Sequence, residues 1–341
     1  MNNRATFIQI NRVFSLTFFL WIILWPGSVN SYSNDEYLTF SYWKTTTDFF
    51  DENNRQYSPV SSSLGYGFEL SSSWSFDLSY EKSKGSGEWL SHKLLKQSFY
   101  ESGESESNSY SVGLSWIPKD HGISFSYSSL DYDESSTTYL PFLVETVMSK
   151  NDVYSVSYIG RWNSDNFDAG GSLENLLSDN QDELELSWSI GFQSFDANTE
   201  IVELPNTDPP VRIDVNLNQK SLSAFVDLEV NYLILSQKIN YSPYLNLGWN
   251  WGLDTSGEEY ILLSRGERTL SFEQSGSRFN SQIRTPDSGQ FSFGLKFIWN
   301  TGTTDGDSSD GLDWITDICY TGSINTEIES SAVRLSFTAY F

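Results

Sequence analysis

Apolar and polar residues alternate with a period of two along most of the chain. In the stretch 74–81, for example, Trp74, Phe76, Leu78 and Tyr80 are separated by polar residues. Such alternation is typical of a strand whose two faces meet different surroundings. We predict twelve strands of this kind, at 37–45, 63–70, 74–82, 108–117, 121–130, 151–162, 183–195, 221–235, 240–252, 289–300, 312–321 and 331–341.

The lengths of these strands and of their connections indicate a membrane barrel. A tilted membrane-spanning strand needs roughly 9–11 residues, and short turns on one side of such a barrel alternate with long loops on the other. Here the short connections 71–73 and 118–120 alternate with long ones at 83–107, 131–150 and 253–288. Segment 163–182 is long where a short turn is expected, and 258–274 has room for an extra hairpin. The count therefore leaves room for about two strands more or fewer.

A soluble β-sandwich would show the same alternation. Aromatic residues favour the barrel, because amphipathic rings prefer the lipid headgroup boundary. Nine of the ten tryptophans after residue 31 fall in predicted strands, among them Trp43, Trp74, Trp116, Trp162, Trp188 and Trp299. An open sheet edge is not viable in lipid, so the sheet must close. We predict an all-β fold, a transmembrane antiparallel up-and-down β-barrel of about 12 strands.

The first thirty-one residues have the layout of a secretory signal peptide. Arg4 and Arg12 precede an apolar block at 13–25, which is followed by Pro26 and small residues up to Ser31. A transmembrane anchor would need about 20 apolar residues, more than this block holds. We predict that 1–31 is cleaved and that 32–341 forms one outer-membrane barrel domain.

The composition excludes several classes of partner and of structural site. The chain has 45 acidic and 20 basic residues, for a net charge of −25, which argues against nucleic acid as a partner. A single cysteine rules out a disulfide framework and a cysteine-based zinc site. An aromatic content of 16% argues against a disordered acidic tail, because disordered segments contain few aromatic residues.

The end of the chain looks like the C-terminal signature read by the bacterial barrel-assembly machinery, with Val333, Leu335, Phe337 and a final Phe341. Several stretches also resemble the β-domain of autotransporters: YSVGLSW at 110–116, YLNLGWNWGLD at 244–254, GQFSFGLKFIW at 289–299 and CYTG at 319–322. The resemblance implies a twelve-stranded barrel. Autotransporters carry a passenger and a pore helix ahead of the barrel, whereas few residues separate Ser31 from Tyr37. We therefore expect a solitary, passenger-less barrel, and the likeness in fold does not carry the family's function over.

Candidate enzyme sites are weak. His121 and Ser124 are close in sequence, but alternation places them on opposite faces of one strand. His92 lies beside a lysine in a predicted loop. The acidic pairs Asp131 with Asp133 and Asp48 with Asp51 are the kind that arises by chance in so acidic a chain. We predict no enzyme activity and no cofactor.

Metal sites are equally weak. The segment DGDSSDG at 305–311 has Asp310 where an EF-hand loop needs glycine, and Thr316 where it needs a bidentate glutamate. Cys319 is read as a small buried residue. We predict no specific metal site, only loosely bound divalent cations.

Alternation also assigns charged residues to the barrel lumen. The predicted lumen-facing acids are Glu69, Asp77, Glu81, Glu185, Asp227, Glu229, Asp313 and Asp317, and the predicted lumen-facing bases are Arg161, Lys296 and Arg334. Such an excess of acids favours cations if the lumen is open. The alternative is that these charges pair across a filled interior, since a barrel of this size can be packed or narrowly open.

These features predict an integral protein in the outer membrane of a Gram-negative-type bacterium, with acidic loops outside and weak cation-leaning permeation. Its partners would be outer-membrane lipid, lipopolysaccharide, the barrel-assembly machinery and loosely bound divalent cations. A dedicated small-solute channel and a surface-binding protein or adhesin working through loops 83–107, 131–150 and 253–288 are the alternatives.

Overall fold

The computed structural model describes residues 36–49, 55–94, 97–139, 142–163, 183–234, 239–266, 268–275, 288–300, 313–324 and 328–340. These ranges contain fourteen strands: β1 (Glu36–Phe49), β2 (Arg55–Tyr57), β3 (Val60–Ser71), β4 (Trp74–Leu94), β5 (Gln97–Trp116), β6 (His121–Tyr139), β7 (Phe142–Asn163), β8 (Glu183–Pro205), β9 (Val211–Leu233), β10 (Asn240–Arg265), β11 (Arg268–Ser275), β12 (Ser288–Asn300), β13 (Asp313–Ile324) and β14 (Ile328–Tyr340). Over these same ranges, no helix is long and apolar enough to cross a membrane.

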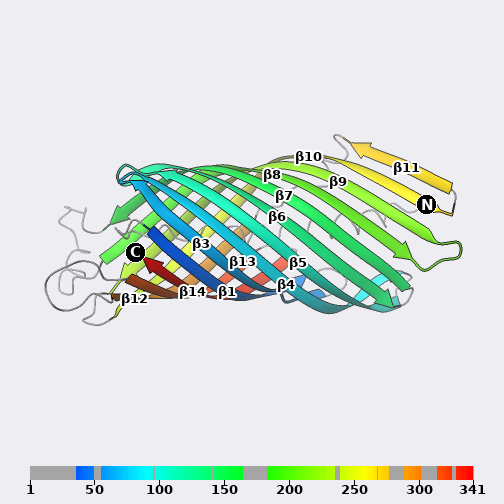
Figure 1. Ribbon diagram of the computed structural model, residues 1–341, viewed down its shortest axis with the longest axis horizontal. Helices are drawn as coiled ribbons and strands as arrows, with labels where there is room; N and C mark the ends of the chain where they lie inside the picture. Colours follow the sequence, from blue (N-terminus) through cyan, green and yellow to red (C-terminus); the bar gives the residue numbers. More distant parts are fainter. Residues whose placement is uncertain are drawn as a thin grey trace.

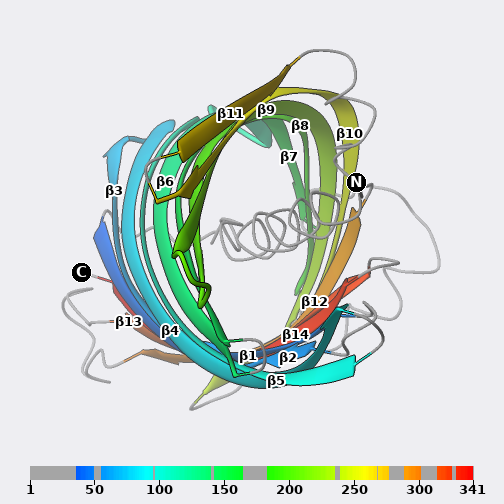
Figure 2. The same ribbon diagram turned by 90° about the vertical axis from the view of Figure 1, so that its right-hand side faces the viewer.

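Twelve of the strands close into a barrel. Each barrel strand pairs antiparallel with its neighbour along the chain, and β14 returns to β1 through pairs such as Phe40 with Phe337. Strands β2 and β11 lie off this ring and pair with β1 and β10. Figure 2 looks along the barrel and shows the strands as one closed wall. All twelve predicted strands are present, so the predicted fold is confirmed.

Many strands are far longer than the sequence pattern predicted. Strands β4 and β5 stay paired from Trp74 and Trp116 to Leu94 and Gln97, and β6 and β7 stay paired up to Tyr139 and Phe142. The predicted loops at 83–107 and 131–150 are therefore wrong, because most of these residues continue the strands. The long β-hairpins project from one end of the barrel (Figure 1), which we call the hairpin end.

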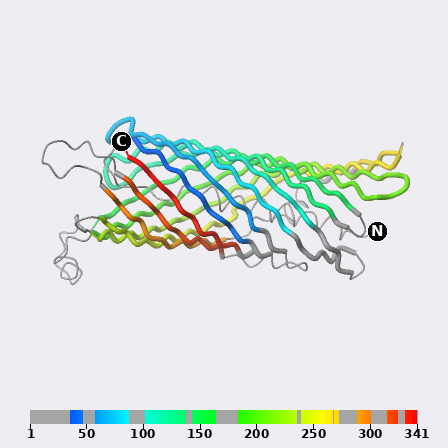
Figure 3. The backbone as a smooth tube through the Cα atoms, turned by 60° about the horizontal axis from the view of Figure 1, so that its bottom comes forward, coloured from blue at the N-terminus to red at the C-terminus, as the bar shows by residue number. Residues whose placement is uncertain are grey.

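The opposite end carries the tight turns 71–73 and 118–120, and we call it the short-turn end. The strands run between the two ends at a steep tilt to the barrel axis (Figure 3). At the hairpin end, Glu258–Arg265 of β10 pairs with Arg268–Ser275 of β11, so the extra hairpin predicted within 258–274 is confirmed. Residues 164–182 of the irregular connection, like the predicted signal peptide, lie outside the described residues.

Polarity reverses along the long strands. On β8, the outward side chains Ile190 and Phe192 are 54% and 55% exposed, as expected of a surface that faces lipid. Further along the same strand the outward positions Ser194, Asp196, Asn198 and Glu200 are polar, and apolar side chains also occupy the inward face. Ile201, on that inner face, is only 4% exposed. The part of the strand nearer the short-turn end thus suits lipid outside the barrel, and the part nearer the hairpin end suits water.

The inward apolar residues near the hairpin end pack together across neighbouring strands. We call them the hairpin core: Val147, Ile201, Val215 and Leu217, with Ile213 and Ile261 against them. Val147 pairs with Ile201, Ile201 with Val215 and Val215 with Ile261, so one apolar row crosses β7, β8, β9 and β10. This row holds the projecting hairpins together where lipid no longer covers them.

A β-bulge changes the alternation of β10. The register shifts between Gly252 and Asp254, and both Leu253 and Asp254 are exposed. A bulge adds one residue to a strand, so the faces exchange beyond it. This exchange explains why the predicted strand stopped at 252 although β10 continues to Arg265.

The aromatic residues of the outer surface include pairs of rings on adjacent strands. Trp74 and Trp116 have ring centroids 6.3 Å apart, and Tyr158 and Trp188 have centroids 5.5 Å apart. Trp43 was predicted to belong to this interfacial set, and that prediction is wrong. Its neighbour Tyr42 is exposed on the outer face, so Trp43 points the other way and lines the interior.

Candidate lumen site

The barrel encloses a cavity of about 760 Å³ whose lining includes many polar and charged residues. Serine and threonine side chains from β1, β3, β5, β6, β7 and β14 make up much of the lining. The charged lining residues are Glu69, Asp77, Glu81, Asp227, Glu229 and Asp317, with Lys119, Arg161, Lys296 and Arg334. The lining therefore includes six of the eight acids and all three bases that alternation assigned to the lumen.

Two of the assigned acids are not part of this lining. Glu185 lies on β8 and acts electrostatically on Arg161, which lies on the adjacent strand β7. Asp313 is the first residue of β13, and its side chain lies outside the described part of the chain. Lys119, which alternation did not assign to the lumen, comes from the turn at the short-turn end.

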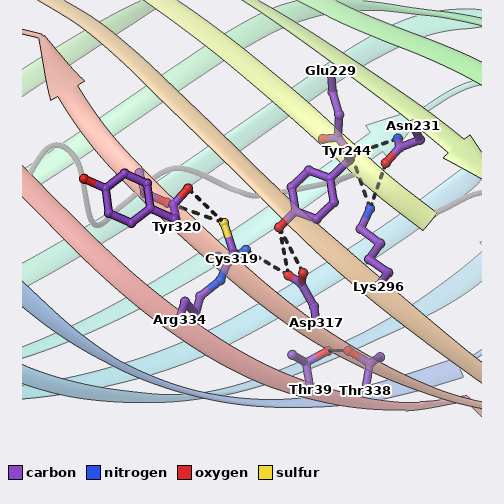
Figure 4. A network of polar contacts seen from close by, with 11 residues as sticks. Thr39, Glu229, Asn231, Tyr244, Lys296, Asp317, Cys319, Tyr320, Arg334 and Thr338 are labelled. Carbon is purple, nitrogen blue, oxygen red and sulfur yellow. Dashed lines mark hydrogen bonds and ion pairs between the residues drawn. The ribbon is translucent and has the colours of Figure 1, made fainter. Parts of the chain in front are cut away.

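A first ion pair joins β9 and β12 across β10 (Figure 4). The Nζ atom of Lys296 lies 3.3 Å from Oε1 of Glu229 and donates to Oδ1 of Asn231 at 3.3 Å. Asn231 Nδ2 donates to the same Glu229 oxygen at 2.9 Å, and the ammonium lies 4.6 Å from the centre of the Tyr244 ring. The charge of Lys296 is thus already matched by a buried acid.

A second ion pair joins β13 and β14. Asp317 accepts hydrogen bonds from the Tyr244 hydroxyl at 3.0 and 3.1 Å, and Nη2 of Arg334 lies 3.4 Å from its Oδ2. The buried thiol of Cys319 is on the same strand, with Sγ 3.6 Å from the carbonyl oxygen of Tyr320. Tyr244 stands between the two ion pairs (Figure 4), so one neutral residue organises both.

Other lumen acids have hydroxyl partners instead of bases. The Tyr37 hydroxyl donates to Asp77, and the Ser189 hydroxyl donates to Oδ2 of Asp227 at 3.0 Å. A hydroxyl satisfies an oxygen but brings no countercharge. With Lys296 and Arg334 already engaged, the remaining charge of the cavity wall is predominantly negative.

Neutral residues of this site were missing from the prediction. Asn231 and Tyr244 carry no charge, so nothing in the sequence distinguished them from other polar strand residues. Their one signal is their position, because both alternate with outward apolar residues and so belong to the lumen face.

The candidate enzyme residues do not come together. His121 is exposed on the outer face, with its ring 6.1 Å from that of Tyr158. Ser124 lines the cavity and accepts a hydrogen bond from Ser115 at 2.9 Å. Asp131 and Asp133 are exposed on the outer face of β6.

Other candidates can be placed only in part. Residues His92 and Asp48 belong to β4 and β1, and Asp51, the 305–311 segment and Phe341 lie outside the described residues. Across the described residues, no group of three or more His, Cys, Asp or Glu side chains is arranged to hold a metal ion. Of the predicted assembly signature, Val333, Leu335 and Phe337 are exposed on the outer face of β14.

Comparison with known proteins places the fold. No protein-family model matches the chain, and no curated protein matches it by sequence. The translocator domain of the autotransporter NalP from Neisseria meningitidis is similar in structure, with a TM-score of 0.58, 9% identity, and coverage of 92% of this chain and 90% of that chain. The transport unit of the autotransporter AIDA-I from Escherichia coli has a TM-score of 0.52, 12% identity, and coverage of 97% and 98%. The chain therefore has the fold of an autotransporter translocator domain, as the sequence motifs predicted.

Proposed function

We propose that this chain is an integral outer-membrane barrel whose lumen passes small cations weakly. The observation that carries the proposal is the cavity wall, in which six acids face four bases and two of those bases are bound to Glu229 and Asp317. Rings and walls of acidic side chains favour cations over anions at close range. The cavity volume of about 760 Å³ leaves room for hydrated ions within the barrel.

The outer membrane is the location that fits the barrel. Exposed apolar and aromatic side chains form a band on its outer face, and only helices and closed barrels satisfy their backbone groups in lipid. The signal-peptide layout of residues 1–31 supplies a route of export, and the C-terminal signature supplies recognition by the barrel-assembly machinery. The short-turn end would then face the periplasm, and the hairpin end would meet lipopolysaccharide and its divalent cations.

The test is ion conductance of the refolded chain in a planar bilayer, with the reversal potential measured under a salt gradient. We expect discrete steps and a reversal potential that indicates cations. Replacing Asp227 and Glu229 together by lysine should move the reversal potential towards anions. Asp196→Lys is the matched control, because Asp196 faces outward on β8 and should leave selectivity unchanged. Silence from a barrel that shows the heat-dependent gel shift of a folded state would refute the proposal.

The projecting hairpins favour surface binding as a second function. β10 has 26 residues, and the sheet it forms with β9 and β11 continues well beyond the roughly 9–11 residues that span a membrane. Replacing 204–212 by an Asn-Gly turn, which removes the tip of the β8–β9 hairpin beyond the Glu203–Ile213 pair and keeps the hairpin core, tests this role. If the hairpins bind cells, bacteria that display the shortened variant should settle more slowly than bacteria that display the wild-type chain, while the barrel of the variant still assembles. Unchanged settling would contradict the binding role.

A further inference from the structure

A glycine on β10 opens a small space in the lumen wall. Asp227 of β9 and Gln290 of β12 are both paired in register with Gly248, one on each side of it. A Cβ atom at Gly248 would lie 2.6 Å from Oδ1 of Asp227 and 4.0 Å from Cβ of Gln290. The Asp227 carboxylate therefore lies over the backbone of β10 and extends towards Gln290, a position that any other residue at 248 would obstruct.

Two oxygen atoms on the residues that flank this space lack a hydrogen-bond donor within the described part of the protein. They are Oδ1 of Asp227 and Oε1 of Gln290, and both residues line the cavity. Asp227 is 8% exposed. A buried polar atom left without a partner costs on the order of 1–3 kcal/mol, and more when it is charged. Because one of these acceptors belongs to a carboxylate, a partner that carries positive charge satisfies the pair better than a neutral donor does.

The basic residues Lys296 and Arg334 do not fill this role, and Arg161 acts electrostatically on Glu185, Glu69 and Glu229. Lys296 is held by Glu229 and Asn231, and Arg334 is held by Asp317. Ser189 satisfies only the second oxygen of Asp227. Burial of Asp227 and repulsion by the nearby acid Glu229 both oppose an unpaired negative charge on its carboxylate. A bound cation or a proton would relieve this cost, and the test below distinguishes the two.

We propose that Asp227 and Gln290 form a binding site for a monovalent metal cation, Na⁺ or K⁺. Carboxylate and amide oxygens are ligands of hard cations. One carboxylate with a neutral amide oxygen supplies a single negative charge, which matches a monovalent ion, whereas calcium sites use several carboxylates. Weak binding of this kind is what a conducting lumen requires, because an ion must leave as readily as it enters. The proposal rests on the proposed function, and it identifies one position in the lumen at which a permeating cation binds.

The direct test uses thallium(I) as a heavy substitute for K⁺. Crystals of the refolded chain are soaked in a thallium salt, and anomalous difference density is measured. We expect a peak within ligand distance of Asp227 Oδ1 and Gln290 Oε1. The peak should be lost in Asp227→Asn, which removes the charge, and in Gly248→Ala, whose Cβ displaces the carboxylate. It should persist in Asp196→Asn, the control on the outer face. A wild-type map without this peak, or a peak that survives in Asp227→Asn, overturns the proposal.

Two further results separate this site from the proposed function. A thallium peak in a barrel that is silent in bilayers supports the site as a fixed counterion position and removes only the permeation. Cation-selective conductance with no thallium peak removes only the site. The rival to a cation is a proton on Asp227. A carboxylic-acid band in the infrared spectrum that disappears in Asp227→Asn, with no thallium peak, would assign that proton and overturn the cation site.

Discussion

Ile190 and Asn198 share the outward face of β8 but meet different surroundings, and this difference predicts a large contrast between two arginine substitutions. Both side chains are exposed, yet Ile190 lies among apolar outward residues and Asn198 among polar ones. Eight residues at about 3.3 Å each, tilted by about 40°, separate them by about 20 Å along the barrel axis. That distance is enough to carry Asn198 out of the hydrocarbon layer.

Arginine in the apolar stretch should cost about 2–4 kcal/mol, the value for a lipid-facing cation near the bilayer midplane. Ile190→Arg is therefore expected to lower the folding equilibrium constant about 30- to 1,000-fold. Asn198→Arg exchanges one hydrated polar side chain for another and should change stability by less than about 0.5 kcal/mol. The comparison separates the effect of lipid from that of side-chain size.

The assay is reversible urea unfolding in phosphatidylcholine vesicles, followed by tryptophan fluorescence and by the heat-dependent shift on gels. The wild-type chain and both variants are measured in the same vesicles. Equal costs for the two substitutions, or a greater cost at Asn198, would refute the reasoning, because the two positions would then share one environment.

Three more substitutions probe the lumen and the hairpins. Lys296→Met leaves Glu229 buried without its ion pair, so we expect a loss of up to about 3–5 kcal/mol in urea unfolding, which the double variant with Glu229→Gln should largely recover. Ile201→Ala removes part of the hairpin core and should cost about 2–5 kcal/mol, whereas Val202→Ala on the opposite face should cost much less in the same titration. Burial raises the pKa of Glu259 at the hairpin end above its ordinary value, so the folded state holds this proton to higher pH than the unfolded chain does. Its contribution to stability falls as the pH rises from the unfolded pKa to the folded pKa. Glu259→Gln should therefore reduce the change in the free energy of unfolding with pH, measured by urea unfolding at a series of pH values. An unchanged slope would contradict this.

The sequence predicted the membrane-spanning parts of the strands well because lipid and lumen impose opposite preferences on alternate residues. It failed where that pattern reverses. After Phe192 the outward face of β8 becomes polar and Ile201 faces inward, so a search for outward apolar residues ends near 195. On β10 the bulge at Gly252 produced the same loss of signal. In both cases the strand continues because backbone pairing does not depend on which face is apolar.

The lumen could be predicted only to the level of which face each residue occupies. That Lys296 lies beside Glu229 depends on the register of β9, β10 and β12, which brings together residues far apart in the sequence. Alternation fixes a side chain's face but not its neighbour on the next strand. The place of Gly248 between Asp227 and Gln290 is a product of the same register, and a glycine in a strand offers no signal of its own.

The reversal of polarity along β8 also specifies how deeply the strand is inserted in the bilayer. Moved outward by two residues, the strand would bring Phe192 into water, and moved inward it would bring Ser194 into hydrocarbon. In water alone, the apolar residues of its two halves lie on opposite faces, so no single flat sheet can bury both. Such a chain gains little from collapsing before it meets a bilayer, and once there it has one level at which both halves are satisfied. The order of apolar and polar residues along the strand therefore specifies the depth at which it fits the bilayer.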